Sequence, residues 1–258
     1  MLGLIRGELR KLFATRMWLW TLLAVVVLAA LFTSLSIGFG DEADTWTFPL
    51  DSPEGQRTLF GNGRTAAAPL VMMLAAVFVT GEFRHRTAAS TFLATPRRTR
   101  VITAKLIACV VVAAGYGLAA VGANAAVAMP WLSAKGIDFS LLDNGIPTTI
   151  GAVVAATCLY AAIGVGLGAA LREQVATTVG LLIYLFVVEP IVAQIGAISE
   201  WTAYLPGKAG EALIGIELAQ GPMSTGGLDA WQGGLVLGGY AAALVVAGML
   251  TTARKDIV

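Results

Sequence analysis

Six long runs of apolar residues constrain this chain more than any other feature of its sequence. A bilayer core about 30 Å thick takes roughly 20 residues per helical crossing. The runs predict transmembrane helices at 18–38, 65–81, 105–129, 147–171, 175–198 and 231–252. The composition agrees, since 57% of the 258 residues are hydrophobic, 13% are charged and the mean hydropathy is +0.78. The sequence therefore predicts an all-α membrane protein with a single transmembrane domain over residues 1–258.

The basic residues gather on one side of this predicted topology. Four of the 17 Lys and Arg residues lie on one side, namely Arg57, Arg64, Lys135 and Lys208. The others lie on the side of the termini: Arg6, Arg10, Lys11, Arg16, Arg84, Arg86, Arg97, Arg98, Arg100, Lys105, Arg172, Arg254 and Lys255. The positive-inside rule places both termini in the cytoplasm, so we expect a multi-pass protein of the cell membrane. A net charge of +1 without a basic soluble face gives no indication of nucleic-acid binding.

The first 17 residues predict an amphipathic helix. Cations at positions 6, 10 and 11 face away from an apolar stripe. The stripe consists of Leu2, Ile5, Leu9, Leu12 and Phe13. Such a helix lies in the inner interface with its cations near anionic lipid headgroups. A plain basic flank to the first crossing is the alternative.

Three connections are longer than a helix joint needs. The outer loop 39–64 is acidic and rich in Pro and Gly, so we expect only partial order there. The inner connection 82–96 predicts a short cytoplasmic helix and then a turn, with Pro96 near the start of the third crossing. In the outer segment 199–230, apolar residues at helical spacing predict an amphipathic or re-entrant helix dipping into the outer leaflet. They are Ala209, Ala212, Leu213 and Ile216.

The sequence lacks the residue sets of the common catalytic sites. His85 is the only histidine, so there is neither a His-Glu-x-x-His zinc site nor a Ser-His-Asp triad. Gly207-Lys208 is followed by Ala209 and lacks the earlier glycine of a P-loop. We therefore expect a chain that is no enzyme and carries no cofactor or metal. Its energy source would be a partner or an ion gradient.

Glu189, next to Pro190, is the one ionisable residue inside a predicted crossing. Carboxylates in a membrane usually face a bundle interior or a cavity, which makes Glu189 a candidate for the substrate path. The alternative is a protonated or hydrogen-bonded side chain at a proline-broken helix. Asn124 and Gln194 are weaker candidates of the same kind. A single carboxylate and a single break disfavour an ion-coupled transporter.

This layout resembles the permease family of type-2 ABC transporters over nearly the whole chain. The resemblance rests on the amphipathic start, the six crossings and three motifs. These are Gly81-Glu82-Phe83-Arg84-His85-Arg86-Thr87, Phe92-Leu93-Ala94-Thr95-Pro96-Arg97-Arg98 before Lys105, and Tyr204-Leu205-Pro206. The resemblance implies an amino-terminal elbow helix, a coupling helix within 82–96 and a re-entrant outer helix before the sixth crossing.

The resemblance also implies how such a chain works. The coupling residues would be Glu82, Phe83, Arg84, His85, Arg86, Thr87, Phe92 and Leu93. They would dock on two separate ATPase subunits that hold ATP and Mg²⁺, and a second copy or a similar permease would complete the path. The cargo would be a small amphiphilic or hydrophobic molecule, such as a drug, antibiotic or lipid-like compound, leaving the cell. The alternatives are a solvated basic loop that only sets topology, and a self-sufficient immunity or sensor protein. A membrane-embedded enzyme is disfavoured by the missing residue sets.

Overall fold

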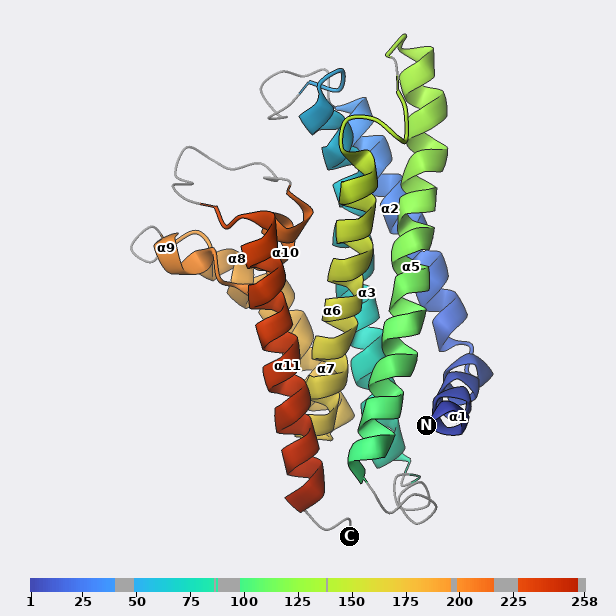
Figure 1. Ribbon diagram of the computed structural model, residues 1–258, viewed down its shortest axis with the longest axis vertical. Helices are drawn as coiled ribbons and strands as arrows, with labels where there is room; N and C mark the ends of the chain where they lie inside the picture. Colours follow the sequence, from blue (N-terminus) through green and yellow to red (C-terminus); the bar gives the residue numbers. More distant parts are fainter. Residues whose placement is uncertain are drawn as a thin grey trace.

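The computed structural model describes residues 1–39, 49–85, 87, 98–137, 139–195, 199–215 and 227–254, and these residues contain no strand. The helices pack as one elongated bundle (Figure 1). Their bounds are α1 Leu2–Ala14, α2 Met17–Gly38, α3 Pro53–Arg84, α5 Arg98–Ala134, α6 Ile146–Leu171, α7 Gln174–Ile183, the π-helix η1 Tyr184–Val188, α8 Glu189–Val192, α9 Ser199–Thr202, α10 Pro206–Ile214 and α11 Ala230–Arg254.

Six helices are long and apolar enough to cross a membrane, as the sequence predicts. They are α2, α3, α5, α6, the fifth crossing formed by α7, η1 and α8, and α11. Helix α6 is the hub of the bundle, because it packs on α3, α5 and α11. Helix α2 lies on the outside against α3 and α5, while the fifth crossing contacts mainly α3.

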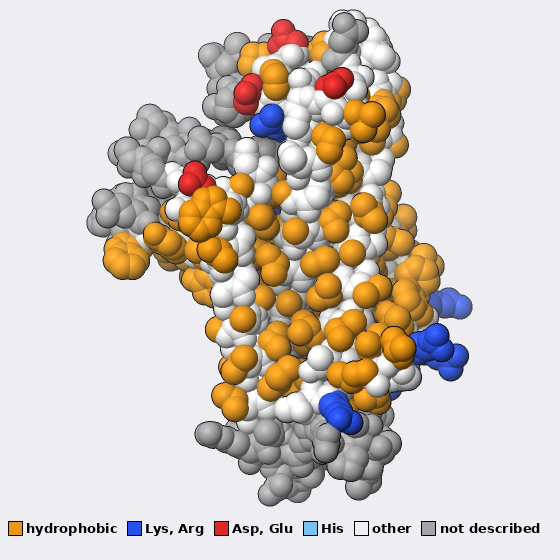
Figure 2. All heavy atoms as spheres, in the orientation of Figure 1, with side chains coloured by type: hydrophobic (Ala, Val, Ile, Leu, Met, Phe, Trp, Pro, Cys, Tyr) orange, Lys and Arg blue, Asp and Glu red, His pale blue; other side chains and the backbone are white. Residues whose placement is uncertain are grey.

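The two ends of the bundle differ in charge. Helix α1 and the last turns of α11 lie at the same end (Figure 1). Figure 2 shows Lys and Arg side chains at this end, several Asp and Glu side chains at the other, and a broad hydrophobic band between them. We call these the basic end and the acidic end. An uncharged apolar belt between charged ends is the surface that a membrane-spanning bundle presents.

Helix α3 is longer than predicted at both ends. We expected a partly ordered loop over 39–64, but the helix already begins at Pro53. The Ser52 hydroxyl caps it by accepting a hydrogen bond from the Gly55 N–H at 3.0 Å, and Pro53 occupies the first turn, where its missing N–H costs nothing. At its other end α3 continues past Gly81 to Arg84. Its 32 residues span about 48 Å, so the helix is longer than the roughly 30 Å bilayer core.

The third and fifth crossings also depart from prediction. Helix α5 runs from Arg98 to Ala134 rather than from 105 to 129. The fifth crossing ends at Val192, whereas we predicted 198, and residues 196–198 lie outside the described part.

The π-helical turn of the fifth crossing precedes Pro190, and the Glu189 N–H donates to the Tyr184 carbonyl five residues back. A proline clashes with the carbonyl four residues before it, and the wider π turn relieves that clash.

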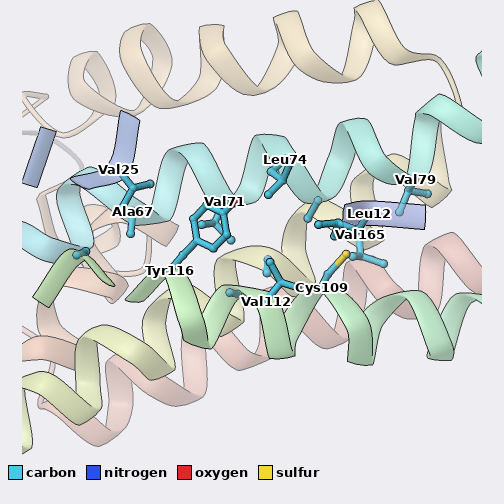
Figure 3. Close-up of a cluster of buried hydrophobic side chains, with 14 of the residues drawn as sticks. Leu12, Val25, Ala67, Val71, Leu74, Val79, Cys109, Val112, Tyr116 and Val165 are labelled. Atoms are coloured by element: carbon cyan, nitrogen blue, oxygen red, sulfur yellow. The ribbon is translucent and has the colours of Figure 1, made fainter. Parts of the chain in front are cut away.

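The largest hydrophobic cluster joins five helices. Figure 3 shows it between α1, α2, α3, α5 and α6. Its labelled members include Leu12, Val25, Val71, Leu74, Cys109, Val112, Tyr116 and Val165. The Tyr116 hydroxyl donates to the Trp18 carbonyl at 2.5 Å, which ties α5 to α2. This core holds α1 and α2 onto the rest of the bundle.

Glycines in α6 let the neighbouring helices approach closely. A Cβ atom on Gly164 would lie 2.2 Å from the Met72 carbonyl oxygen of α3, and one on Gly168 would lie 2.9 Å from that of Ala76. One on Gly166 would lie 2.5 Å from the Leu244 carbonyl carbon of α11. The spaced glycines therefore serve two helix interfaces, and small residues are the usual means of close packing in membranes.

Replacing Gly164 by Ala should weaken the α3–α6 interface. The added methyl group meets backbone that cannot rotate away, so the free energy of unfolding should fall by roughly 1–3 kcal/mol, as for other overpacked sites. Denaturation of the purified protein in mixed micelles measures this. Gly151→Ala on the same helix is the control, because its Cβ would meet open space. Equal stability of the two variants would show that the interface is loosely packed.

Candidate functional site

Four charged side chains from three helices form a closed ring at the basic end. The Lys105 ammonium of α5 lies 2.5 Å from Glu8 of α1 and 2.7 Å from Glu82 of α3. The Lys11 ammonium of α1 contacts the same two carboxylates, at 2.7 Å from Glu8 and 2.9 Å from Glu82. Each amine therefore bridges both carboxylates. We call these four residues the ion-pair ring.

Most of the ring is shielded from solvent. The side chains of Lys105 and Glu8 are each 5% exposed, and the Phe78 ring lies 4.5 Å from the Lys105 nitrogen. Burial alone would lower the pKa of the more exposed Lys11, but hydrogen bonds to Glu8 and Glu82 outweigh it and raise that pKa. Two positive and two negative charges cancel, so the ring offsets the cost of taking each charge out of water.

The ring fixes the start of the predicted coupling segment 82–96. We expected the second crossing to end at residue 81 and this segment to begin at residue 82. Instead, Glu82, Phe83 and Arg84 form the last turn of α3. Pairing of Glu82 with two ammonium groups offsets the cost of burying its carboxylate in this turn. Phe83 packs on the large hydrophobic cluster, and the Arg84 guanidinium donates to the Gln174 side chain at 3.2 Å.

The remaining coupling candidates divide into two groups. His85 and Thr87 are exposed, and the Thr87 N–H donates to the Glu82 carbonyl at 3.0 Å. Arg86, Phe92 and Leu93 lie outside the described residues. The structure thus brings Glu82, Phe83, Arg84, His85 and Thr87 together at the basic end.

Arg172 ties the turn between α6 and α7 to two other helices. This residue adopts a left-handed conformation with φ of 58°. Its guanidinium donates to the Thr251 carbonyl of α11 and lies 5.7 Å from the centre of the Phe83 ring. Together with the Arg84–Gln174 contact, it connects the last turn of α3 to the fourth, fifth and sixth crossings.

Glu189 lies near the other end of the bundle and is buried. Its carboxylate accepts a hydrogen bond from the Gly207 N–H of α10 at 2.5 Å. The residue at the N-cap of α10 is Leu205, which has no side-chain acceptor to offer. Glu189 therefore satisfies a backbone donor at a helix N-terminus, where a negative charge is favoured.

Two further buried side chains meet α10 beside Glu189. The Tyr160 hydroxyl of α6 donates to the Pro206 carbonyl at 2.8 Å. Arg64 of α3 lies 3.5 Å from Glu211 of α10, while its Nε atom has no hydrogen-bond partner. We call Glu189, Tyr160 and Arg64 the outer clamp, because three separate crossings hold one short helix through them.

The other two candidates for the substrate path, Asn124 and Gln194, have different hydrogen-bonding partners. Asn124 is fully buried between α5 and α3, where its amide donates to the Leu59 and Phe60 carbonyls at 3.1 and 3.2 Å. Gln194 is exposed at the end of the fifth crossing and donates to the Pro190 carbonyl at 3.1 Å. The three candidates therefore do not line one surface, and each has a local hydrogen-bonding partner.

Sequence reasoning missed Glu8 and Arg64 as interior charges. Glu8 is the one acidic residue in a strongly basic amino-terminal segment, and that exception was the available signal. Arg64 was placed at the end of a loop, because the apolar run starts only after it. Its position three turns into α3 follows from the Ser52-Pro53 helix start, which marks an N-terminus twelve residues earlier than the hydropathy does.

No protein-family model matches the chain, and no curated protein is significantly similar to it.

Replacing Lys105 by Met should destabilise the basic end strongly. The change leaves two buried carboxylates with Lys11 as their only ring cation, and breaking a buried pair typically costs about 3–5 kcal/mol. Unfolding in mixed micelles measures the loss. The control is Arg100→Met, an exposed cation less than two turns away on α5. A Glu8→Leu/Lys105→Met double variant keeps the Lys11–Glu82 pair and should recover much of the stability; no recovery would contradict the ring as the cause.

Proposed function

We propose that this chain is the membrane-spanning permease subunit of an ATP-driven exporter of the type-2 ABC class. In this proposal it moves a small amphiphilic or hydrophobic molecule out of the cell. Separate ATPase subunits bind ATP and Mg²⁺ and supply the energy.

The observation that carries the proposal is the ion-pair ring together with the Arg172 and Arg84 contacts. A loop that only set topology would need positive charge and no fixed geometry. Instead, the base of the 82–96 segment is joined to α1 and α5 through the ring, and to α7 through Arg84. A push on this segment would therefore reach several crossings at once, which is what a coupling helix requires.

The positions of α1 and α10 support the same proposal. Helix α1 buries Glu8 and Leu12 against the bundle and exposes Arg6 and Arg10, as an interfacial elbow helix would. Helix α10 forms where the re-entrant helix was expected and packs on α6 and α11. In this reading the basic end is cytoplasmic and both termini lie there.

The fifth crossing supports a dimeric permease. It packs on few neighbours, and its exposed apolar side chains include Val175, Val179, Leu182, Ile183, Phe186, Val187, Val188 and Ile191. A second permease copy or a similar permease would cover part of this face, lipid would cover the rest, and an apolar wall suits amphiphilic cargo.

Affinity purification in mild detergent tests the proposal. Purified from its native cell, the chain should bring down an ATPase subunit in near-equal amount, and the complex should hydrolyse ATP. Phe92→Asp places a charge in the proposed docking segment and should abolish co-purification while the permease still inserts. Leu142→Asp, at a highly exposed residue of the acidic end, is the matched control and should leave association unchanged.

Two outcomes would overturn the proposal. A wild-type chain that purifies alone without ATPase activity would favour a self-sufficient membrane protein. Association that survives Phe92→Asp would remove the 82–96 segment from the docking surface.

Cysteine labelling tests the proposed orientation. Cysteines introduced at His85 and at Leu142 occupy opposite ends of the bundle, and both positions are exposed. In intact cells a membrane-impermeant maleimide should label the Leu142→Cys variant and leave His85→Cys unlabelled until the membrane is opened. The native Cys109 is buried and Cys158 is half-buried, and Cys109→Ser/Cys158→Ser provides the background. Labelling of His85→Cys alone would invert the topology.

A further inference from the structure

Glu189 lies at a break in the fifth crossing, where it meets the short helix α10, which Tyr160 of α6 and Arg64 of α3 also contact. The break has a local cause, because Pro190 and the π turn at 184–188 interrupt the regular helix. Beyond the break, α8 is a single turn, and its first residue, Glu189, contacts the N-terminus of α10. Nothing in the proposed function explains why a carboxylate belongs at this point.

The contacts of Glu189 are those of a capping group. Its Oε1 atom accepts a hydrogen bond from the Gly207 N–H at 2.5 Å, which is short for such a bond. A charged acceptor makes hydrogen bonds roughly twice as strong as a neutral one, and the dipole of α10 adds to the attraction. Side-chain caps normally come from the residue just before the helix, but here the cap lies 18 residues away in the chain.

Two glycines of α10 make room for the side chains that hold it. A Cβ atom on Gly207 would lie 2.3 Å from Glu189 Oε1, and its three nearest atoms would all belong to the Glu189 carboxylate. A Cβ atom on Gly210 would lie 2.7 Å from the Tyr160 hydroxyl oxygen and 3.3 Å from an Arg64 nitrogen. Because Gly207 and Gly210 have no side chain, the side chains of the outer clamp occupy the space beside them.

We propose that Glu189 is a positioning residue that holds α10 against the fifth crossing, so that α8 and α10 move as one body. We call this contact the latch. The Glu189 carboxyl oxygen is engaged by the backbone of α10 and not by cargo. Tyr160 and Arg64 hold the same helix from α6 and α3. Any motion that separates the outer end of the fifth crossing from α10 must first break the Glu189 contacts.

Hydrogen exchange measured by mass spectrometry on the purified full chain tests the latch. The readout is the exchange rate of the peptide that contains the Gly207 and Lys208 amides. Glu189→Ala should raise this rate by roughly tenfold or more, because a hydrogen bond to a charged group is lost. Glu189→Gln keeps an acceptor oxygen without the charge and should give a smaller increase.

A double-variant cycle separates the latch from general loosening. Gly207→Ala should also raise the exchange rate, because the new methyl group displaces the carboxylate. In the Glu189→Ala background the same change should add little, since the atoms it would meet are gone. Gly180→Ala is the control, because a Cβ atom there would meet open space in the same crossing.

The latch would be overturned if the exchange rate of this peptide were unchanged in Glu189→Ala. It would also be overturned if the increases caused by Glu189→Ala and Gly207→Ala simply added in the double variant. Circular dichroism and gel filtration of each variant show that it remains folded. Glu189→Gln keeps the size of the side chain, so it provides the test if Glu189→Ala does not fold. The exchange measurement needs neither ATPase nor cargo, so its result is independent of the proposed function.

Discussion

The cost of burying charge in an apolar interior governs both ends of this bundle. An isolated charge there costs several kcal/mol, so buried charges survive only where they are paired or hydrogen-bonded. At the basic end the ion-pair ring brings two carboxylates and two ammonium groups from α1, α3 and α5 together. Near the acidic end the Glu189 carboxylate meets a backbone donor of α10, and Arg64 meets Glu211. Each arrangement joins segments that the apolar crossings alone would leave free to slide.

Helix α3 connects these two arrangements, because Arg64 and Glu82 lie on the same continuous helix. Between them α3 packs against the glycines of α6 at backbone distance, and such contacts transmit displacement with little give. A movement at the basic end could therefore reach the outer clamp along this one helix, which contains Pro69 between the two arrangements. This continuity is the physical reason why the proposed function assigns both clusters to one mechanical unit.

Hydropathy was enough to predict the six crossings, because each of them contains a long stretch of high mean hydropathy with few charged residues. Hydropathy failed to locate the start of α3. This helix begins at the Ser52-Pro53 cap, and its hydrophilic first turns, including Arg64, carry no hydropathy signal. The position of Glu189 was predictable as unusual, but its partner was not, since Gly207 is an ordinary turn-like glycine in the sequence. Likewise the ring depends on Glu8 and Lys105, which are 97 residues apart, and no local pattern pairs them. Tertiary packing decides such contacts, and a single sequence carries no signal for them.

Inverting the ring tests the central claim most directly. A Lys105→Glu variant places three carboxylates against one ammonium group and should lose both stability and co-purification of an ATPase. The quadruple variant Glu8→Lys/Lys11→Glu/Glu82→Lys/Lys105→Glu restores the alternation of charges, so it should regain both. Recovery by the inverted ring would show that the ion-pair geometry fixes the base of the 82–96 segment. If Lys105→Glu retained ATPase association, or the inverted ring recovered stability without association, the link between the ring and coupling would be contradicted.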